Sequence, residues 1–340
     1  MRIREAAERA ARSANRDRDR SPIGDQSGTR NPQSAIPCRP LLKWAGGKRQ
    51  LLPHLRRFYP AEFNRYIEPF FGSGAVFFDL HAAGRLRDRE VLLIDSNADL
   101  IGCYATVRAQ PDAVARELER LAAAHALGGE TQYYAVRDQQ FNPIRDRLRD
   151  GDGGIAYTPQ LAAMLIYLNR TGFNGLFRLN ARGEFNVPAG RYDRPKIADR
   201  EKVARVSEAL SSAGLRLVCG GFESVAEMAA PGDFVYFDPP YAPVNRTSNF
   251  TSYTARRFGP EDQRRLQQIA IALARRGCSV LLSNSTADEI AALYEDNAEA
   301  RAAGLRAIRV PARRAINSNA ARRGPVEEFL VTNHAPAVLL

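Results

Sequence analysis

An apolar run in the second half of the chain ends in residues that could do chemistry. Phe234–Phe237 (FVYF) has the pattern of a buried strand, and it is followed directly by Asp238, Pro239, Pro240 and Tyr241. The prolines explain why the strand stops, because proline lacks the backbone N–H that would continue a ladder. They do not explain the carboxylate or the aromatic ring. The segment is therefore either an ordinary loop or a functional site.

A glycine-containing turn follows another predicted strand. Glu68–Gly74 (EPFFGSG) joins the run Arg65–Phe70 to a helix predicted from Ala75. Gly72 and Gly74 would let the backbone pass close to a ligand at the carboxyl edge of a parallel sheet. A tight strand–helix turn needs glycine in any case, so this turn alone is weak evidence for a site.

Two acidic residues strengthen this interpretation. Asp95 ends the run Val91–Asp95 (VLLID), where it can accept hydrogen bonds from a ribose diol, and Asp238 follows a third run. Because ligands of parallel α/β sheets bind outside the carboxyl ends of the strands, these acids and glycines predict one binding crevice. The alternative is that each is placed there by coincidence.

The segment Lys43–Lys48 (KWAGGK) carries the only tryptophan of the chain, Trp44, between two lysines. Its glycine pair before Lys48 suggests a phosphate loop. The spacing GxxxxGK[ST] is not met, however, because Arg49 follows Lys48. A nucleoside triphosphatase is therefore disfavoured.

Alternating strands and helices must position these residues. Helices are expected from Ala75, after Asn97 and from Gly259, where Pro260 and two acids mark a helix start. Alternation of this kind predicts an α/β fold, doubly wound around a mostly parallel seven-stranded sheet, and the last two runs suit an antiparallel hairpin. The predicted strands are Arg65–Phe70, Val91–Asp95, Leu215–Val218, Phe234–Phe237, Ser279–Leu282, Leu305–Val310 and Glu328–Thr332.

Composition limits the classes of function. The net charge of +11 favours a polyanionic partner such as nucleic acid. No apolar run approaches the roughly 20 residues needed to cross a bilayer, so we expect no membrane association and a cytoplasmic location. The four cysteines and four histidines are scattered, which argues against a metal site or a disulfide framework.

Two segments depart from the strand–helix rhythm. Residues 111–205 combine helical patterns with a polar stretch rich in Asn, Arg and Gly, and they are predicted to be an inserted, mainly helical domain. The first domain would then comprise 39–110 and 206–340. Residues 1–38 lack a sustained apolar pattern and are expected to be a disordered basic extension, either a dispensable tail or an auxiliary DNA-binding arm.

Taken together, the motifs resemble those of the Dam-type (D12 class) DNA adenine N6-methyltransferases. The resemblance covers about residues 40–333 in the order typical of the family, and residues 1–38 have no recognisable counterpart. It implies a methyltransferase of Rossmann-like fold that uses S-adenosylmethionine, releases S-adenosylhomocysteine, and acts as a monomer on one strand of duplex DNA. The matching segments are KWAGGK (43–48), EPFFGSGAVFF (68–78), IDSNADLI (94–101), LNRTGFNGLFRLNARGEFNVPAGRY (168–192), DPPYAP (238–243) and LLSNS (281–285).

This resemblance gives the residues after Phe237 a role. An adenine amino group is a poor nucleophile, because its lone pair is delocalised into the ring. The Asp238 carboxylate and the Pro239 carbonyl can accept its two hydrogens, while Pro240 keeps the turn rigid. Tyr241 can stack on an adenine that has left the duplex. No covalent nucleophile and no metal is required.

The resemblance also implies two sets of binding residues, with Asn97 and Asp99 left as helix-start residues. The cofactor would be bound by Trp44, Lys48, Phe70, Gly72, Gly74, Asp95 and Asp238. The inserted domain would recognise the target sequence, most simply GATC: Arg178 and Lys43 would read guanines, Leu176 and Pro188 would contact a thymine methyl, and Asn174 would meet the base left unpaired. Phe173, Arg191 and Tyr192 would support the DNA stack. Phe173 stands where the family often has tyrosine, so a hydroxyl contact is lost while stacking remains.

Other functions were weighed against this one. A non-catalytic DNA-binding protein would be expected to have a damaged DPPY motif or no cofactor aspartate, and neither is seen. Transfer to cytosine N4, RNA or protein is disfavoured, because cytosine N4 enzymes more often carry SPPY. The alternatives of a solitary enzyme and a member of a restriction–modification system both stay open.

Overall fold

A computed structural model describes residues 39–44, 46–151, 153–242, 258–313 and 325–336. The predicted basic extension (1–38) lies outside these described residues. So do Ala45 and Pro243 of two of the motifs, and the loop 314–324 between the last two strands.

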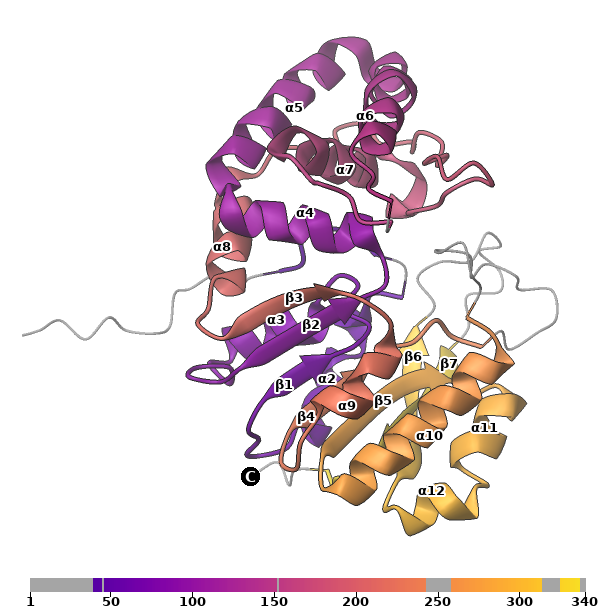
Figure 1. Ribbon diagram of the computed structural model, residues 1–340. Helices are drawn as coiled ribbons and strands as arrows, with labels where there is room; N and C mark the ends of the chain where they lie inside the picture. The colour runs from indigo at the N-terminus through magenta and orange to yellow at the C-terminus, as the bar shows by residue number, and fades with distance from the viewer. Residues whose placement is uncertain (1–38, 45, 152, 243–257, 314–324, 337–340) are drawn as a thin grey trace, which may run out of the picture. The chain divides into compact units, whose positions relative to one another are not determined.

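Within the described residues, seven strands form one sheet in the order β3-β2-β1-β4-β5-β7-β6 (Figure 1). β1 to β5 are parallel to one another, and β7 runs antiparallel to both β5 and β6. The predicted α/β fold and its terminal hairpin are therefore confirmed. The strands are β1 (Tyr66–Glu68), β2 (Val91–Asp95), β3 (Leu215–Cys219), β4 (Phe234–Phe237), β5 (Ser279–Ser285), β6 (Arg306–Arg313) and β7 (Pro325–Thr332).

Helices cover both faces of the sheet because alternate strand residues point to opposite sides. Ile67 and Val235 belong to a core with helices α9 (Val225–Met228), α10 (Pro260–Arg276), α11 (Asp288–Tyr294) and α12 (Ala298–Ala302). Their neighbours Tyr66 and Tyr236 belong to a second core with α2 (Leu52–Leu55), α3 (Ala75–Ala82) and α4 (Ala98–Ala109). The parallel strands β1, β2, β4 and β5 are therefore buried on both sides, as their continuous apolar runs predicted, whereas β3 at the edge of the sheet exposes Arg216 and Cys219.

The second core continues into the helices that follow α4. These helices are α5 (Pro111–Tyr134), the π-helical segment η4 (Ala135–Phe141), α6 (Asn142–Arg147), α7 (Pro159–Thr171) and α8 (Arg200–Leu210). The side chain of Thr158 accepts a hydrogen bond from the Leu161 N–H at the start of α7, and Pro159 occupies its first turn. The predicted boundary at residue 205 lies inside α8.

Two predicted helix starts are confirmed by their hydrogen bonds. Asn97 caps α4, since its Oδ1 accepts a 3.1 Å hydrogen bond from the Leu100 N–H. At α10, which begins at Pro260, the Asp262 carboxylate accepts a 2.9 Å bond from the Gly259 N–H. Each helix begins directly after a capping residue whose backbone is extended, so residues close in sequence fix where each helix starts.

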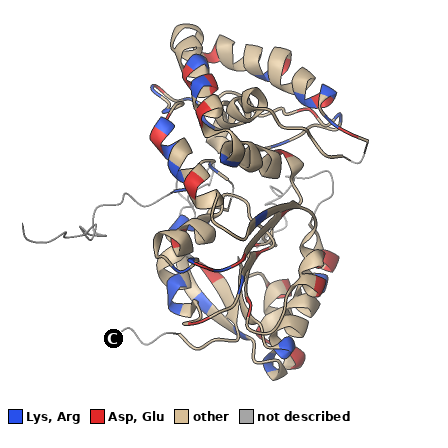
Figure 2. Cartoon of the chain, turned by 60° about the vertical axis from the view of Figure 1, so that its left-hand side comes forward, with Lys and Arg blue, Asp and Glu red and all other residues tan. Residues whose placement is uncertain are grey.

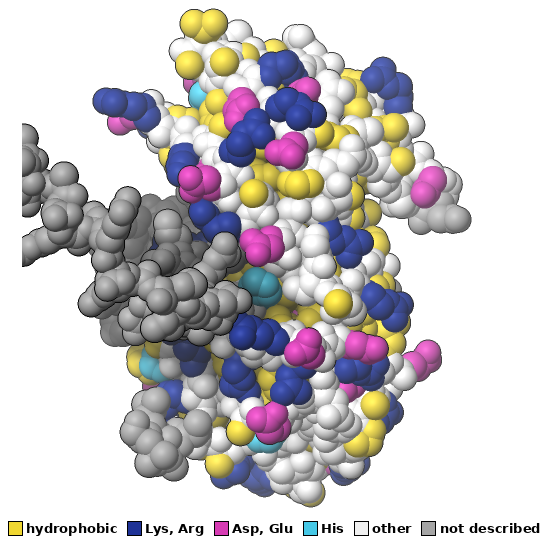
Figure 3. Space-filling model, turned by 90° about the vertical axis from the view of Figure 1, so that its left-hand side faces the viewer, with side chains coloured by type: hydrophobic (Ala, Val, Ile, Leu, Met, Phe, Trp, Pro, Cys, Tyr) yellow, Lys and Arg dark blue, Asp and Glu magenta, His cyan; other side chains and the backbone are white. Residues whose placement is uncertain are grey.

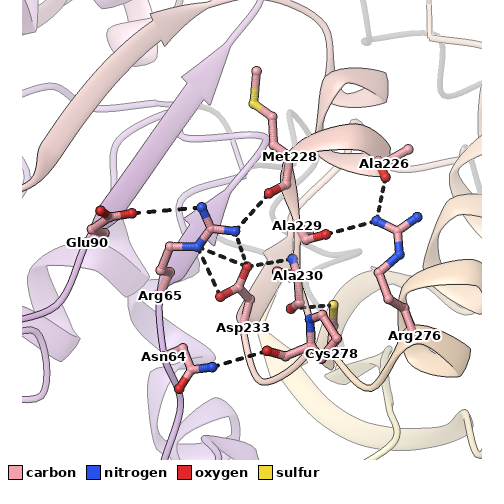
Figure 4. A network of polar contacts seen from close by, with 11 residues as sticks. Asn64, Arg65, Glu90, Ala226, Met228, Ala229, Ala230, Asp233, Arg276 and Cys278 are labelled. Carbon is pink, nitrogen blue, oxygen red and sulfur yellow. Dashed lines mark hydrogen bonds and ion pairs between the residues drawn. The ribbon is translucent and has the colours of Figure 1, made fainter.

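A charged clamp holds the amino-terminal edge of the sheet (Figure 4). Arg65, just before β1, donates to Asp233, just before β4, with Nη2 2.6 Å from Oδ2. The same guanidinium donates to the Met228 carbonyl at 2.8 Å, and Asp233 also accepts from the Ala230 N–H. The side chain of Asp233 is only 1% exposed, so this ion pair links the two central strands at the edge opposite their carboxyl ends.

Candidate active site

The direction in which the chain adds strands to the sheet reverses between β1 and β4. From β1 the chain moves outward through β2 and β3, and β4 and β5 lie on the other side of β1. Such a switch point leaves the loops after the two central strands facing one crevice. Here these loops are Phe70–Gly74 after β1 and Asp238–Tyr241 after β4.

Asp238 is held by two other segments. Its Oδ1 lies 2.7 Å from Lys48 Nζ and accepts a 3.1 Å hydrogen bond from the hydroxyl of Ser283, on the adjacent strand β5. Among the described residues, both of these contacts go to Oδ1. Within the same residues, Oδ2 has no hydrogen-bond partner.

In its environment, the Asp238 carboxylate takes up a proton more readily than an exposed carboxylate would. Burial raises the pKa of Asp238, while Lys48 and the Ser283 hydroxyl oppose that effect. The nearby Glu328 carboxylate raises this pKa further, because it disfavours a second negative charge. The residue combines a raised pKa with a specific cation and a place in a crevice, which is a pattern typical of functional sites.

Lys48 is a buried cation with two oxygen partners. It belongs to the short 3-10 helix η2 (Lys48–Gln50), its side chain is 7% exposed, and Nζ donates to the Gly46 carbonyl at 2.7 Å as well as pairing with Asp238. Nζ also lies 4.3 Å from the centroid of the Tyr241 ring. The KWAGGK segment therefore contacts the DPPY turn directly.

A hydrogen bond from helix α10 supports the DPPY turn. The Pro240 carbonyl accepts a 3.0 Å hydrogen bond from Gln263 Nε2 of α10, and Gln263 is fixed in turn by Asn284 Nδ2 at 2.9 Å. Among the described residues, the Pro240 carbonyl is thus occupied, whereas the Pro239 carbonyl has no such partner. The turn presents one carboxylate oxygen and one carbonyl as acceptors.

The turn after β1 is built around Asp95. The Asp95 carboxylate accepts 2.9 Å hydrogen bonds from the backbone N–H groups of Gly72 and Asn97, one to each oxygen. Burial raises the pKa of Asp95 to about 6, although both N–H donors favour its ionised form. Gly74 has φ +70°, and a side chain there would collide with the Phe71 ring.

Aromatic rings flank this turn on two sides. Phe70 stacks on Phe222, with ring centroids 5.2 Å apart, and meets Phe258 edge-on at 5.7 Å. Trp44 stacks on Phe177 at 5.7 Å and lies 3.1 Å from where a Gly72 side chain would begin. A carboxylate at a strand end, a turn with two glycines and aromatic rings on two sides are an arrangement suited to an adenosine-like group.

The predicted DNA-reading residues lie on one loop, 172–192, with a single exception. Phe173, Asn174, Arg178, Pro188, Arg191 and Tyr192 are exposed and Leu176 is half-buried. The exception is Lys43, whose backbone N–H and carbonyl bond the side chain of Asn169 at 2.8 and 2.7 Å. Lys43 Nζ lies 4.5 Å from the centroid of the Tyr192 ring, so this residue joins the loop in space.

A known protein family matches most of the segments that form this site. The model of the D12 class N6 adenine-specific DNA methyltransferases matches residues 44–313. The chain belongs to this family. The family transfers a methyl group to N6 of adenine in DNA, and this chemistry implies S-adenosylmethionine as the donor.

Relatives match over most of their own length. The "Type II methyltransferase M1.LlaDCHI" of Lactococcus lactis subsp. cremoris is 37% identical over 302 residues, which cover 89% of this chain and 98% of that protein. The "Type II methyltransferase M.MjaIII" of Methanocaldococcus jannaschii is 38% identical, covering 87% of this chain and 99% of that protein. The "DNA adenine methylase" of Escherichia coli K12 is 35% identical, covering 86% and 94%.

Two structural observations bear on other classes of function. In the part of the chain that the structure describes, no helix is long and apolar enough to cross a membrane. Within the same residues, His, Cys, Asp and Glu side chains form no group suited to hold a metal ion.

A buried ion pair lies against the loop 172–192 of this methyltransferase. Arg145 of α6 donates to both oxygens of Asp99 at 2.7 Å, and the Tyr157 hydroxyl adds a 2.8 Å bond. Arg145 also donates to the Gly183 carbonyl of the loop at 2.7 Å. Asp99, expected only to start a helix, therefore also links α4 to the loop.

Sequence reasoning missed three residues of the site. Ser283 and Glu328 lie on strands β5 and β7 and contact Asp238 and Tyr241, and Phe222 follows β3. Two of them carried a usable signal: Phe222 follows Gly220 and Gly221 at the end of a predicted parallel strand, and Ser283 stands in the LLSNS segment that matches the family.

Proposed function

We propose that this DNA adenine N6-methyltransferase acts as a monomer on GATC in duplex DNA, on an adenine flipped into a pocket made by Asp238–Tyr241. The observation that carries the proposal is the arrangement of Asp238. Its Oδ1 is taken by Lys48 and Ser283. Within the described residues neither Oδ2 nor the Pro239 carbonyl has a hydrogen-bond donor, so the two would serve as a pair of acceptors. An amino group with two hydrogens matches such a pair.

The residues of the pocket act by positioning and charge. Asp238 Oδ2 and the Pro239 carbonyl accept the two amino hydrogens, which directs the N6 lone pair out of the plane of the base. Lys48 keeps Asp238 ionised despite its burial, and Tyr241 offers its ring to the base. Aligned acceptors in a partly dry site can supply much of a transfer barrier.

The cofactor site follows from the same edge of the sheet. S-adenosylmethionine, when bound, supplies a methyl group on a sulfonium centre. Asp95 would accept from the ribose hydroxyls, Gly72 and Gly74 would leave room for the ligand, and Trp44 and Phe70 would provide apolar contact. Lys48 and Asp238 would border the reacting end.

The inserted helices and the loop 172–192 would form the recognition domain (111–205). Arg178 is already oriented, because its Nε donates to Asn186 Oδ1 at 2.8 Å and its Nη2 donates to the Asn186 carbonyl at 3.2 Å. Lys and Arg residues are interspersed with Asp and Glu along the ribbon in Figure 2, and their side chains are interspersed on the face shown in Figure 3. Base-reading side chains on the loop would thus add to a diffuse positive charge.

The function is tested by methylation of an unmethylated plasmid. The protein is incubated with labelled S-adenosylmethionine, and the modified bases are mapped. We expect label on N6 of adenine, at GATC and not at sites that differ in one base. Modified adenine in another sequence would refute the GATC proposal and leave the adenine chemistry intact.

Specificity should depend on Arg178. Arg178→Ala should reduce discrimination at one guanine by about 1–3 kcal/mol, because a bidentate contact to guanine is lost. Rates on GATC and on each single-base variant measure this effect. Arg182→Ala, on the same exposed loop, serves as the control and should leave the ratio of rates unchanged. Equal losses on all sequences after Arg178→Ala would reduce this residue to an electrostatic contact.

Cofactor affinity should depend on pH through Asp95. Its pKa of about 6 means that the carboxylate is protonated at lower pH and accepts ribose hydrogens poorly. The dissociation constant for S-adenosylmethionine should therefore rise as pH falls below about 6, by up to about tenfold per pH unit. Calorimetric titrations between pH 5 and pH 8 measure this dependence. Asp95→Asn should bind weakly with a flat profile over this range; a variant with the wild-type profile would assign the dependence to another group.

A further inference from the structure

A second carboxylate, on strand β7, contacts the DPPY turn. Glu328 lies on β7, and its Oε2 accepts a 2.7 Å hydrogen bond from the Tyr241 hydroxyl. β7 runs antiparallel to β5 and pairs Glu328 with Ser285, the last residue of β5. Because of this reversed direction, a residue near the start of β7 lies at the carboxyl edge of the parallel strands. The proposed transfer mechanism makes no use of this carboxylate.

The Tyr241 ring is held at two points. Burial raises the pKa of Tyr241 well above its usual value, and the charges of Asp238 and Glu328 raise it further, so the hydroxyl remains a donor. Its hydrogen bond to Glu328 is charge-assisted and therefore strong. The Lys48 ammonium lies 4.3 Å from the ring centroid. One contact fixes the phenolic oxygen and the other lies over the ring.

The charged groups around the DPPY turn also influence one another. Lys48 pairs with Asp238, and the negative charge of Glu328 raises the pKa of Asp238. The buried carboxyl of Glu68, on β1, has its own pKa raised well above the usual range, chiefly by burial. The groups that face Asp238 from the surrounding elements are Lys48, Glu68, Tyr236, Tyr241, Ser283 and Glu328.

We propose that Glu328 is a positioning residue for methyl transfer, which holds the Tyr241 ring in the plane that receives the target adenine. The proposal rests on the proposed function, in that Tyr241 must stack on that base. A stacking ring that can swing away would lower the population of correctly placed adenine. The loss would then appear in kcat more than in the affinity for the DNA duplex.

The first test removes the hydrogen bond from either end. Glu328→Ala and Tyr241→Phe should each lower kcat by about tenfold or more, the range expected for a hydrogen bond to a charged group. The double variant should be no slower than the slower single variant, because the same bond is lost only once. Glu327→Gln is the matched control: Glu327 is the exposed neighbour on the same strand, with its carboxylate 3.7 Å from Arg309. It should keep the wild-type kcat.

The second test uses charge, which a purely structural role would not move. Glu328→Gln keeps the volume and an acceptor for the hydroxyl but removes the negative charge. The pKa of Asp238 should fall, so the acidic limb of the kcat profile should shift to lower pH. Tyr241→Phe and Glu327→Gln should leave that limb in place. Melting temperatures of all variants show which of them are folded at the assay temperature.

The outcomes separate this inference from the function on which it rests. Additive losses in the double variant would overturn the positioning role of Glu328, and an unshifted acidic limb in Glu328→Gln would overturn its charge effect on Asp238. If Tyr241→Ala kept the wild-type kcat, the stacking role of Tyr241 in the proposed function would fail instead. If kcat fell in Tyr241→Ala but stayed at the wild-type value in Glu328→Ala, only the positioning role of Glu328 would be refuted.

Discussion

Replacing Asp238 with Ala should lower the rate of adenine methylation by at least about 100- to 1,000-fold, the loss typical of removing one preorganised group at a reacting centre. The variant leaves the adenine amino group with one acceptor, and it leaves Lys48 without its carboxylate partner 2.7 Å away. Binding to duplex DNA should largely survive, because the loop 172–192, which we propose to contact the DNA, contains none of these atoms. Single-turnover rates and a binding titration on the same oligonucleotide measure the two effects separately.

Asp233 supplies the matched control for this result. It precedes β4 as Asp238 follows it, and it is equally committed to a cation, Arg65, at 2.6 Å. Asp233→Ala should lower the melting temperature but keep the methylation rate at temperatures where the protein is folded. Near-normal turnover by Asp238→Ala would remove the proposed mechanism, whatever the stability of the variant.

Breaking the buried pair between Arg145 and Asp99 should have the largest effect on stability. Arg145→Ala should reduce the free energy of unfolding by about 3–5 kcal/mol, because it leaves the Asp99 carboxylate buried without a cation. The side chains of Arg145 and Asp99 are 6% and 4% exposed, so water can do little to replace the lost partner. Urea unfolding followed by circular dichroism measures the change.

Two further variants show whether the orphaned charge is the cause. The double variant Arg145→Met with Asp99→Asn should recover part of the loss, because no buried charge remains and Asn can still accept from Tyr157. Arg120→Ala breaks an exposed pair with Glu117 and should change stability little. A double variant as unstable as Arg145→Ala would instead point to the lost hydrogen bond to Gly183.

Much of the sheet and of the helices around it was predictable because the signals are local. The apolar runs of β2 and β4 have the predicted bounds, since a strand buried on both faces needs a continuous apolar sequence. Asn97 caps α4 as expected, because a cap uses a side chain and a backbone N–H only three residues apart. Strand ends and turns also placed Asp95 and Asp238 correctly at one edge of the sheet.

Contacts between distant segments were not predictable in the same way. Asp99 was expected only to start a helix, yet its carboxylate binds Arg145, 46 residues away. Asn169 fixes the backbone of Lys43 across 126 residues. Neither side chain has a periodicity or spacing that names its partner, because the partner depends on how the helices after α4 pack.

The class of fold, the order of the strands along the chain and the motifs typical of the family can all be recognised in the amino-acid sequence. They follow from the period of the apolar residues and from the chemistry of turns, which act over a few positions. The contacts of Ser283 with Asp238 and of Glu328 with Tyr241 arise only when the sheet has formed. The physical reason is the order of strands in the sheet: the antiparallel β7 lies beside β5, which brings a carboxylate from near the end of the chain to the edge where the parallel strands end.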